Sequence, residues 1–493
     1  MVSFLFRVMS GSLGYWNIPQ VGYHKKMNTS YDASGSFRTE QDSLGEVSVP
    51  ENALYGAQTQ RAVDNFKISG QPLPAEFIHA VARIKKSAAI ANQSMNFLTA
   101  EETKAISDAA DSIVAGKYPD QFPIDVYQTG SGTSTNMNVN EVIVHIARQD
   151  SQKTLSPNDH VNKGQSSNDV IPSAIHVVSA QLVKQQLLPA LETLEAMLDQ
   201  RAKELENVAK TGRTHLMDAM PVTMGQELSG WKAMIQQDKA HIVHAFDELC
   251  HLTLGGTAVG TGTNTDPAFA GKVCQALSQE MGITFSPTAN FFAAQSLPSA
   301  PLALSAALKG LAATLMKIAN DLRWMNSGPF SGLGEIALPV LQPGSSIMPG
   351  KVNPVIPEAV AMVAAQLIGF DAAVTIATQS GSFQLNVMLP LIANNLVQGI
   401  QLASNACTAL TEKALAGFEV RRDHINESLY RNPILVTALN PIVGYMKAAK
   451  IAKRAYAENR SVIDVACDET DMDRAELEKL LNPVHLTKGG ISK

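Results

Sequence analysis

Four long stretches of the chain keep apolar residues at spacings of three and four over lengths that no ordinary strand reaches. They cover residues 180–210, 225–252, 301–328 and 358–418, and they predict long α-helices. Within them, segments 302–318 and 359–376 are apolar around nearly the whole helix circumference. A helix with one side in water does not tolerate this pattern, so we expect both segments to be buried on all sides, in part by other subunits.

The 493 residues exceed the size at which a single hydrophobic core usually stops growing, so two or three domains are expected. Residues 39–165 mix short helices with turn signals such as "SGQPLP" and "GKYPDQFP", which predicts an N-terminal domain. Residues 166–418 hold the long helices of a central bundle domain. Residues 419–493 carry shorter, charged helices joined by "RNP" and "LNP", and they predict a small C-terminal helical domain. The expected fold class is mainly α.

The N-terminal segment 1–38 precedes this organisation and carries Arg7, Lys25 and Lys26 with no acidic residue before Asp32. That composition suits an organellar presequence, but no amphipathic arginine stripe accompanies it, and Met27 offers an alternative start. We expect a disordered extension on a cytoplasmic protein, with mitochondrial import as the alternative. No membrane span is expected, because the most apolar window, 387–403, is interrupted by a proline and several amides.

Charge and cysteine content exclude several classes of function. With 39 Lys+Arg against 45 Asp+Glu, the net charge of −6 provides no basic surface for nucleic acid or an anionic membrane. The four cysteines lie far apart without a C-x-x-C pair, which argues against a zinc ribbon or an iron–sulfur cluster and favours a reducing compartment.

One predicted helix carries a candidate metal site. Residues His241, His244, Glu248 and His251 recur at three- and four-residue spacing on one predicted helix and can share a face. Such residues more often form the solvated side of a helix, and no second segment supplies ligands. We therefore expect no metal.

Four polar stretches interrupt the helices, and they are the best candidates for a binding site. They read "QTGSGTSTNMNVNEV" (128–142), "KGQSSNDV" (163–170), "KTGRTHLMDAMPV" (210–222) and "GSSIMPGKVNP" (344–354). Each places hydroxyl, amide or imidazole groups beside glycine or at a predicted helix start, where unpaired N–H groups can bind a carboxylate. One such stretch is usually a helix cap or a loop, and four with the same chemistry favour a site for an anionic ligand.

Nucleotide binding is the obvious rival for glycine-rich loops, and the spacing excludes it. Five residues separate Gly344 from Gly350, and Val352 follows Lys351, so the stretch fails the phosphate-loop pattern. In "TGSGTST", Thr135 stands where a dinucleotide fingerprint needs its third glycine.

The order and content of these motifs resemble class II fumarate hydratases of the fumarase/aspartase superfamily. The resemblance includes "SLGEVSVPENALYGAQTQRAVDNF", "GRTHLMDA" and "GGTAVGTG", and it runs from about residue 39 to the C-terminal domain. Aspartate ammonia-lyases usually differ by Gln at His215, alanine at Gly350 and "GGAGTS" in place of "TGSGTS". Argininosuccinate and adenylosuccinate lyases carry bulkier or more basic residues around Val352.

The resemblance implies a three-domain fold whose central bundle forms the core of a homotetramer, with active sites shared between subunits. It implies reversible hydration of fumarate to L-malate, a tricarboxylic acid cycle step, through an aci-carboxylate intermediate and without a metal or an organic cofactor. Ser345 would exchange the carbon-bound proton, His215 held by Glu358 would handle the water, and Lys351 would bind developing negative charge. The implied substrate-binding residues are Ser131, Gly132, Thr133, Ser166, Ser167, Asn168, Thr214, Ser346, Lys351, Val352 and Asn353.

Two departures from the family pattern limit these expectations. Ser156 replaces the usual histidine of "HPND", which puts in doubt a second dicarboxylate site at Ser156, Pro157, Asn158 and Asp159. "GSFQLN" replaces "GNFELN" through Ser382 and Gln384, which removes a carboxylate. The alternative activity is that of aspartate ammonia-lyase or another superfamily lyase. The alternative outside catalysis is a recruited structural protein, against which the intact catalytic set argues.

Overall fold

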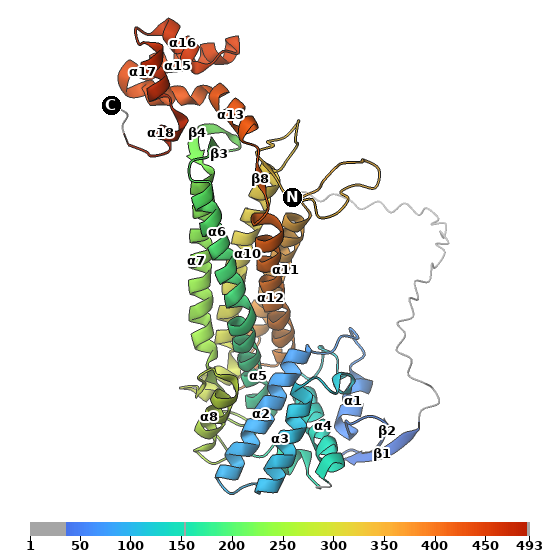
Figure 1. The fold of residues 1–493 in the computed structure, drawn as a ribbon. Coiled ribbons are helices and arrows are strands. Elements are labelled where there is room, and N and C mark those ends of the chain that lie inside the picture. Colours follow the sequence, from blue (N-terminus) through green and yellow to red (C-terminus); the bar gives the residue numbers. More distant parts are fainter. Residues whose placement is uncertain (1–35, 152–153, 491–493) are drawn as a thin grey trace, which may run out of the picture.

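In the computed structural model, which describes residues 36–151 and 154–490, long helices form a tall bundle with a helical domain at each end (Figure 1). The mainly α fold predicted from the spacing of apolar residues is confirmed. The extension expected over residues 1–38 lies outside the described residues, except for its last positions. Phe37 and Arg38 already belong to a strand.

The N-terminal domain is built on three helices that pack side by side, α2, α3 and α4 (Figure 1). A capping box between Thr99 and Glu102 begins α3. Glu141 of α4 accepts hydrogen bonds from the backbone N–H groups of Gly56, Gln58 and Thr59, which fixes the start of α1. The elements are β1 (Phe37–Asp42), antiparallel to β2 (Gly45–Pro50), α1 (Ala57–Asn65), α2 (Ala75–Ser94), α3 (Ala100–Val114), η1 (Pro119–Gln121), α4 (Thr133–Ser151) and η2 (Pro157–Val161).

The central domain contains the long helices that the apolar spacing predicts, with two exceptions. The run 358–418 is not one helix, because residues 380–388 form a turn between α11 and α12. Residues 209–223, within and after another predicted run, form the antiparallel hairpin β3–β4. The elements are α5 (Ser167–Leu182), η3 (Val183–Leu187), α6 (Leu188–Glu204), β3 (Ala209–Thr214), β4 (Met217–Thr223), α7 (Met224–Leu249), β5 (His251–Leu252) parallel to β6 (Ser286–Pro287), α8 (Phe269–Met281), α9 (Phe291–Ser296), α10 (Ser299–Met325), β7 (Ile336–Ala337), α11 (Val355–Gln379), α12 (Leu389–Leu410) and η4 (Thr411–Leu415).

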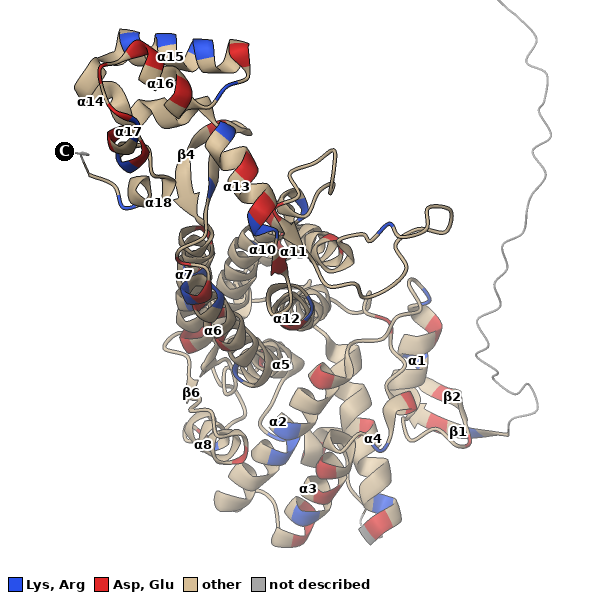
Figure 2. Cartoon of the chain, turned by 45° about the horizontal axis from the view of Figure 1, so that its top comes forward, with Lys and Arg blue, Asp and Glu red and all other residues tan. Residues whose placement is uncertain are grey.

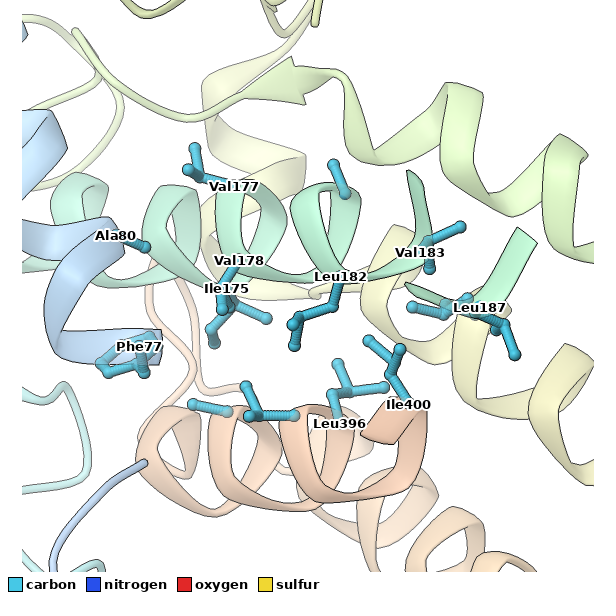
Figure 3. Close-up of a cluster of buried hydrophobic side chains, with 14 of the residues drawn as sticks. Phe77, Ala80, Ile175, Val177, Val178, Leu182, Val183, Leu187, Leu396 and Ile400 are labelled. Carbon is cyan, nitrogen blue, oxygen red and sulfur yellow. The ribbon is translucent and has the colours of Figure 1, made fainter. Parts of the chain in front are cut away.

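Buried side chains from three helices meet where α5 lies between α2 and α12. Phe77 of α2, Ile175 of α5 and Leu396 of α12 meet there with further aliphatic side chains (Figure 3). All three are buried. One continuous hydrophobic cluster therefore joins the expected N-terminal and central domains, so the start of α5 is held by packing on both sides.

Helices α10 and α11 leave apolar surface uncovered within one chain. Met362, Ile368 and Ile376 on α11 are 68%, 42% and 58% exposed. Among the described residues, α10 and α11 are also long and apolar enough to cross a membrane by length and composition, a criterion that core helices of soluble proteins meet as well. Charged residues gather instead on α3, α6, α7 and the C-terminal helices (Figure 2), and α12 has none.

The C-terminal domain has a hydrophobic core of its own. Leu439, Ile451, Val465 and Leu477 lie in its centre, separate from the main cluster. Its first strand, β8 (Glu419–Val420), pairs antiparallel with β7 and anchors the domain to the bundle. The remaining elements are α13 (Arg422–Arg431), η5 (Pro433–Leu439), α14 (Asn440–Val443), α15 (Tyr445–Glu458), α16 (Val462–Glu469), α17 (Arg474–Leu480) and α18 (Pro483–Leu486).

We predict that His176 makes the folded state sensitive to acid. This buried side chain on α5 lies 3.1 Å from the carbonyl oxygen of Leu249, and burial lowers its pKa from 6.5 to about 4. As the pH falls, the unfolded chain binds a proton at His176 before the folded protein does. The stability that neutral His176 contributes to the folded state is therefore complete above pH 6.5 and is lost as the pH falls toward 4. The loss amounts to about 3 kcal/mol.

The variant His176→Gln keeps a donor near Leu249 but does not titrate. Urea denaturation at pH 7.0 and pH 4.5 should show a larger loss of stability for the natural protein than for the variant. Equal losses would show that His176 is not the acid-sensitive group.

Candidate active site

Ser131, Gly132 and Thr133 form the turn that begins α4. The hydroxyl oxygens of Ser131 and Thr133 lie 2.8 Å apart. Gly132 has a φ of +71°, and a Cβ placed there would lie 2.9 Å from the Ile171 side chain on α5. Only glycine therefore allows the start of α4 to approach α5 this closely. The N–H of Thr135 donates 3.1 Å to Oε1 of Gln128, so the N–H groups at the very start of α4, at Thr133 and Ser134, are the ones that can face an anion.

Ser166, Ser167 and Asn168 begin α5 next to that turn, and the helix start predicted there is confirmed. The Ser166 hydroxyl accepts a hydrogen bond of 3.2 Å from the backbone N–H of Asn168. Asn136 of α4 donates 3.1 Å to the hydroxyl of Ser167. The structure thus brings the first two polar stretches together, with the N-termini of two helices converging on one place.

A buried polar network that sequence reasoning missed supports these two turns. Lys85 of α2 is fully buried, and its Nζ donates to the side-chain oxygens of Asn162 (2.9 Å) and Gln165 (3.1 Å). Asn136 also donates to Asn162 at 3.1 Å. Burial lowers the pKa of Lys85 to about 7. The available signal was the run of amides "NMNVN" on an otherwise apolar helix.

Asp169 links the start of α5 to the glycine-rich stretch "GGTAVG". Its carboxylate accepts hydrogen bonds from the backbone N–H groups of Ser166 (2.9 Å), Gly255 (3.1 Å) and Thr257 (2.9 Å). Burial raises its pKa to about 6. Gly255 and Thr257 follow α7, which ends at Leu249. The start of α5 is therefore bonded to the segment that directly follows the C-terminal end of α7.

His215 lies at the tip of the β3–β4 hairpin. Thr214 pairs with Met217, so His215 and Leu216 form a two-residue turn, with φ values of 56° and 60°. Positive φ at both positions is the mark of a tight primed turn, but it usually recruits Asn-Gly. Left-handed backbone at residues other than glycine costs on the order of 1–3 kcal/mol each and is concentrated at functional sites. Thr214, His215 and Leu216 are all exposed in the single chain.

Ser345 lies in the loop between β7 and α11. Its Oγ accepts hydrogen bonds from the backbone N–H groups of Ile347 (3.3 Å) and Met348 (3.0 Å). Two donors on one hydroxyl oxygen stabilise negative charge there. The following residue, Ser346, and Val352 are exposed.

Lys351 and Asn353 close the same loop. The ammonium of Lys351 donates 2.8 Å to Oδ1 of Asn353, whose Nδ2 donates 2.5 Å to the Gly344 carbonyl. A Cβ at Gly344 would lie 1.8 Å from the Lys351 carbonyl oxygen, so glycine is required where the two strands of the loop meet. The loop therefore holds a serine and a lysine in one compact unit.

Glu358 lies in the first turn of α11, and its carboxylate has no side-chain partner among the described residues of one chain. The structure does not join Glu358 to His215 within the chain. Nor does it bring His215 to the carboxylate-binding turns. The hairpin that carries His215 precedes α7, whereas Thr257, which is bonded to Asp169 at the start of α5, follows α7. With 26 residues, α7 is about 39 Å long, so these groups lie at opposite ends of the bundle (Figure 1).

The histidines considered as metal ligands do not form one face of a helix. His241, His244 and Glu248 lie on α7, but this helix ends at Leu249, and His251 lies in β5 with Nδ1 2.8 Å from the Ser286 hydroxyl. The prediction that all four share a helix is therefore wrong. In residues 36–151 and 154–490, no group of three or more His, Cys, Asp or Glu side chains is placed to hold a metal ion.

Comparison with known proteins identifies the family. A family model described as lyase matches residues 45–369, and one described as fumarase C C-terminus matches residues 435–488. The Pseudomonas aeruginosa protein named fumarate hydratase class II 2 is 56% identical over 454 residues, covering 92% of this chain and 99% of that protein. A Bacillus subtilis fumarate hydratase class II is 44% identical over 457 residues, covering 92% and 99%.

The chain belongs to the class II fumarate hydratase family. The crystal structure of class II fumarase from Schistosoma mansoni matches it with a TM-score of 0.89 at 35% identity, covering 92% of this chain and 99% of that chain. That of fumarate lyase:delta crystallin from Brucella melitensis in native form matches with a TM-score of 0.84 at 42% identity, covering 90% and 100%.

The turn at residues 156–159 shows what the departure from the class II fumarate hydratase pattern changes. The Ser156 hydroxyl donates 2.7 Å to the Asp159 carboxylate and accepts 3.1 Å from the Asp159 backbone N–H. The Ser156 N–H donates 2.9 Å to Nδ1 of His160. Ser156 therefore makes its contacts inside η2, while Asn158 and Asp159 are exposed. A second dicarboxylate site here stays a prediction, with no imidazole at position 156.

The second departure, Ser382 and Gln384, lies in the turn after α11 and not within a helix. Ser382 forms an isolated bridge with Leu385, around Phe383 with its φ of 54°. Asn386, fully buried, donates hydrogen bonds to the carbonyls of Ala377 and Thr378 and holds this turn to the end of α11. Nothing in the structure explains the two replacements.

We predict that Gly132→Ala lowers stability more than Gly116→Ala. Both positions have nearly the same positive φ, +71° and +73°, so both variants carry a backbone cost of about 1–2 kcal/mol. A Cβ at position 116 meets nothing within 4 Å, whereas one at position 132 meets Ile171. The difference should be at least about 1 kcal/mol. Urea denaturation of the two variants measures it, and equal losses would show that α4 and α5 can separate at this point without cost.

Proposed function

We propose that this protein catalyses the reversible hydration of fumarate to L-malate. The observation that carries the proposal is the convergence of the α4 and α5 N-termini, lined by Ser131, Thr133 and Ser166, in a chain of the class II fumarate hydratase family. Helix N-termini and hydroxyl groups suit a carboxylate, and a dicarboxylate needs a second set of donors. Lys351 and Asn353 of the loop supply that set.

Each remaining step has a side chain with suitable chemistry. Water loses a proton to His215 as its oxygen bonds to one carbon, and the electrons of the double bond move into the adjacent carboxylate. The resulting aci-carboxylate carries two negative charges, which Lys351 and Asn353 offset. Ser345 then protonates the other carbon. Transfer of the water-derived proton from His215 to the Ser345 alkoxide, by way of solvent, restores both side chains. The net reaction adds one water to fumarate, and neither oxidant nor reductant is consumed.

Ser345 becomes an alkoxide in this step, which is unfavourable for an ordinary serine. The N–H groups of Ile347 and Met348 already point at its oxygen, and Lys351 lies in the same loop. These contacts support a serine that gives up a proton more readily than one in water. In the reverse direction the same alkoxide removes the proton from L-malate.

We propose that the active protein is a cytoplasmic homotetramer and that each site takes residues from several chains. The exposed apolar side chains of α11 and the distance along α7 between His215 and Ser166 support this assembly. Glu358 would then hold the imidazole of His215 from another chain. Side chains supply every proton and every counter-charge, so no cofactor is proposed, and neither nucleic acid nor a membrane is among the proposed partners.

Deamination of aspartate is the alternative in the same superfamily. Hydration is favoured by His215 at the hairpin tip, by Gly350, and by the sequence "TGSGTS" at the start of α4. A structural role alone would leave Ser345, Lys351 and Glu358 without function.

We predict rapid hydration of fumarate and no comparable reaction with aspartate. The purified protein is mixed with fumarate, and loss of the absorbance of the conjugated double bond is followed. The same absorbance is followed for its appearance with L-malate and with aspartate as substrates. Turnover of aspartate equal to or above that of L-malate would overturn the proposal. No turnover of any of the three would favour the structural alternative.

A further inference from the structure

Glu335 joins two parts of the chain that the proposed mechanism uses separately. Its Oε1 accepts a hydrogen bond of 2.7 Å from Nη1 of Arg213, and its Oε2 lies 2.7 Å from Nζ of Lys210. The second contact is electrostatic, because its angles do not suit a hydrogen bond. Arg213 and Lys210 both belong to β3, the strand that leads to His215. One carboxylate therefore contacts two cations of β3, one near each end of the strand.

The backbone of Glu335 is fixed just before the loop that carries Ser345. Its N–H donates 2.8 Å to the Met325 carbonyl at the end of α10, and its carbonyl accepts 2.9 Å from the N–H of Arg421. The next two residues are β7, which pairs with β8. Glu335 thus lies at the root of the Ser345 loop and is held from both sides.

Glu335 is the carboxylate that pairs with both cations of β3, Lys210 and Arg213. The side chains of Lys210 and Glu335 are 3% and 4% exposed. Glu227 of α7 completes the set with a hydrogen bond of 2.7 Å from Lys210. Removing a partner from a buried ion pair leaves an uncompensated charge, so the two cations of β3 would repel each other without Glu335. Among the described residues, Glu227 forms an ion pair with Lys210 but not with Arg213.

We propose that Glu335 is a positioning residue that holds the hairpin bearing His215 against the root of the loop bearing Ser345. This inference rests on the proposed catalytic role of His215. Among the described residues, the Glu335 carboxylate pairs with Arg213 and Lys210 and not with the substrate-binding side chains proposed above. Glu335 therefore acts through the backbone of β3. Only Thr214 separates Arg213 from His215, so a small movement of the strand displaces the imidazole. Displacement of a catalytic group by about 1 Å can cost on the order of 100-fold in rate.

The test is a double-mutant cycle between Glu335→Gln and His215→Asn, with Glu227→Gln as the matched control. Glu335→Gln should lower kcat by about 10- to 100-fold and change KM by less than about threefold. KM should change little because the turns at the starts of α4 and α5 are remote, and because Lys351 and Asn353 are held by contacts within their own loop. Glu227→Gln should stay within about twofold of the natural protein. In the His215→Asn background, measured with concentrated enzyme, Glu335→Gln should have less than about a twofold further effect.

The outcomes separate this inference from the proposed function. Near-normal turnover of His215→Asn alone would remove His215 from the mechanism. If His215→Asn is severely impaired but Glu335→Gln lowers kcat equally in both backgrounds, or Glu227→Gln is equally damaging, the positioning role is overturned. Should Glu335→Gln fail to assemble by size-exclusion chromatography, the same cycle is run with Arg213→Gln, which removes the contact nearest His215.

Discussion

The apolar surface of α11 is the constraint on which the rest of the structure depends. Its charged residues are Glu358 and Asp371, and the single chain covers one side of it with α10 and α12. Asp371 is buried and paired with Lys309 and the Ser305 hydroxyl, so it does not supply a polar outer face. Exposed Met362 and Ile376 then remain in water unless another copy covers them. Assembly of several chains would bury this apolar face of α11 between them.

The same bundle determines where chemistry can occur. Its helices are long and straight enough that the hairpin and the carboxylate-binding turns cannot meet within one chain (Figure 1). Packing of α5 between α2 and α12 fixes those turns, and Glu335 fixes the hairpin to the loop root. A rigid scaffold with polar loops at its ends therefore suits a site assembled from several copies, because each copy presents its groups in a defined place.

The long helices could be predicted from sequence because apolar spacing over more than twenty residues has few alternatives. The break at residues 380–388 was missed, because apolar residues continue on both sides of it. The hairpin was missed because His215 and Leu216 occupy turn positions that usually recruit Asn-Gly.

The start of α5 could be predicted from the hydroxyl and amide groups of "KGQSSNDV", a local pattern, and the structure shows a capping box between Ser166 and Asp169 there. Lys85, Asn162 and Glu335 were missed, because their importance depends on contacts between distant segments that no local pattern encodes. The catalytic candidates were predicted from the resemblance of the motifs. Within one chain, the hairpin with His215 and the turns at the starts of α4 and α5 lie at opposite ends of the bundle, so a single copy does not join them.

Complementation between two inactive variants tests the central claim, that each active site takes His215 from one chain and Ser345 from another. Ser345→Ala and His215→Asn are unfolded together, refolded, and assayed with fumarate, with a tag on one variant to isolate mixed oligomers. Random assortment places both intact groups at about a quarter of the sites if they come from different chains, so activity should recover to about that fraction of the natural protein. Mixed oligomers that remain as inactive as the parents would contradict the claim and place both residues of a site on the same chain.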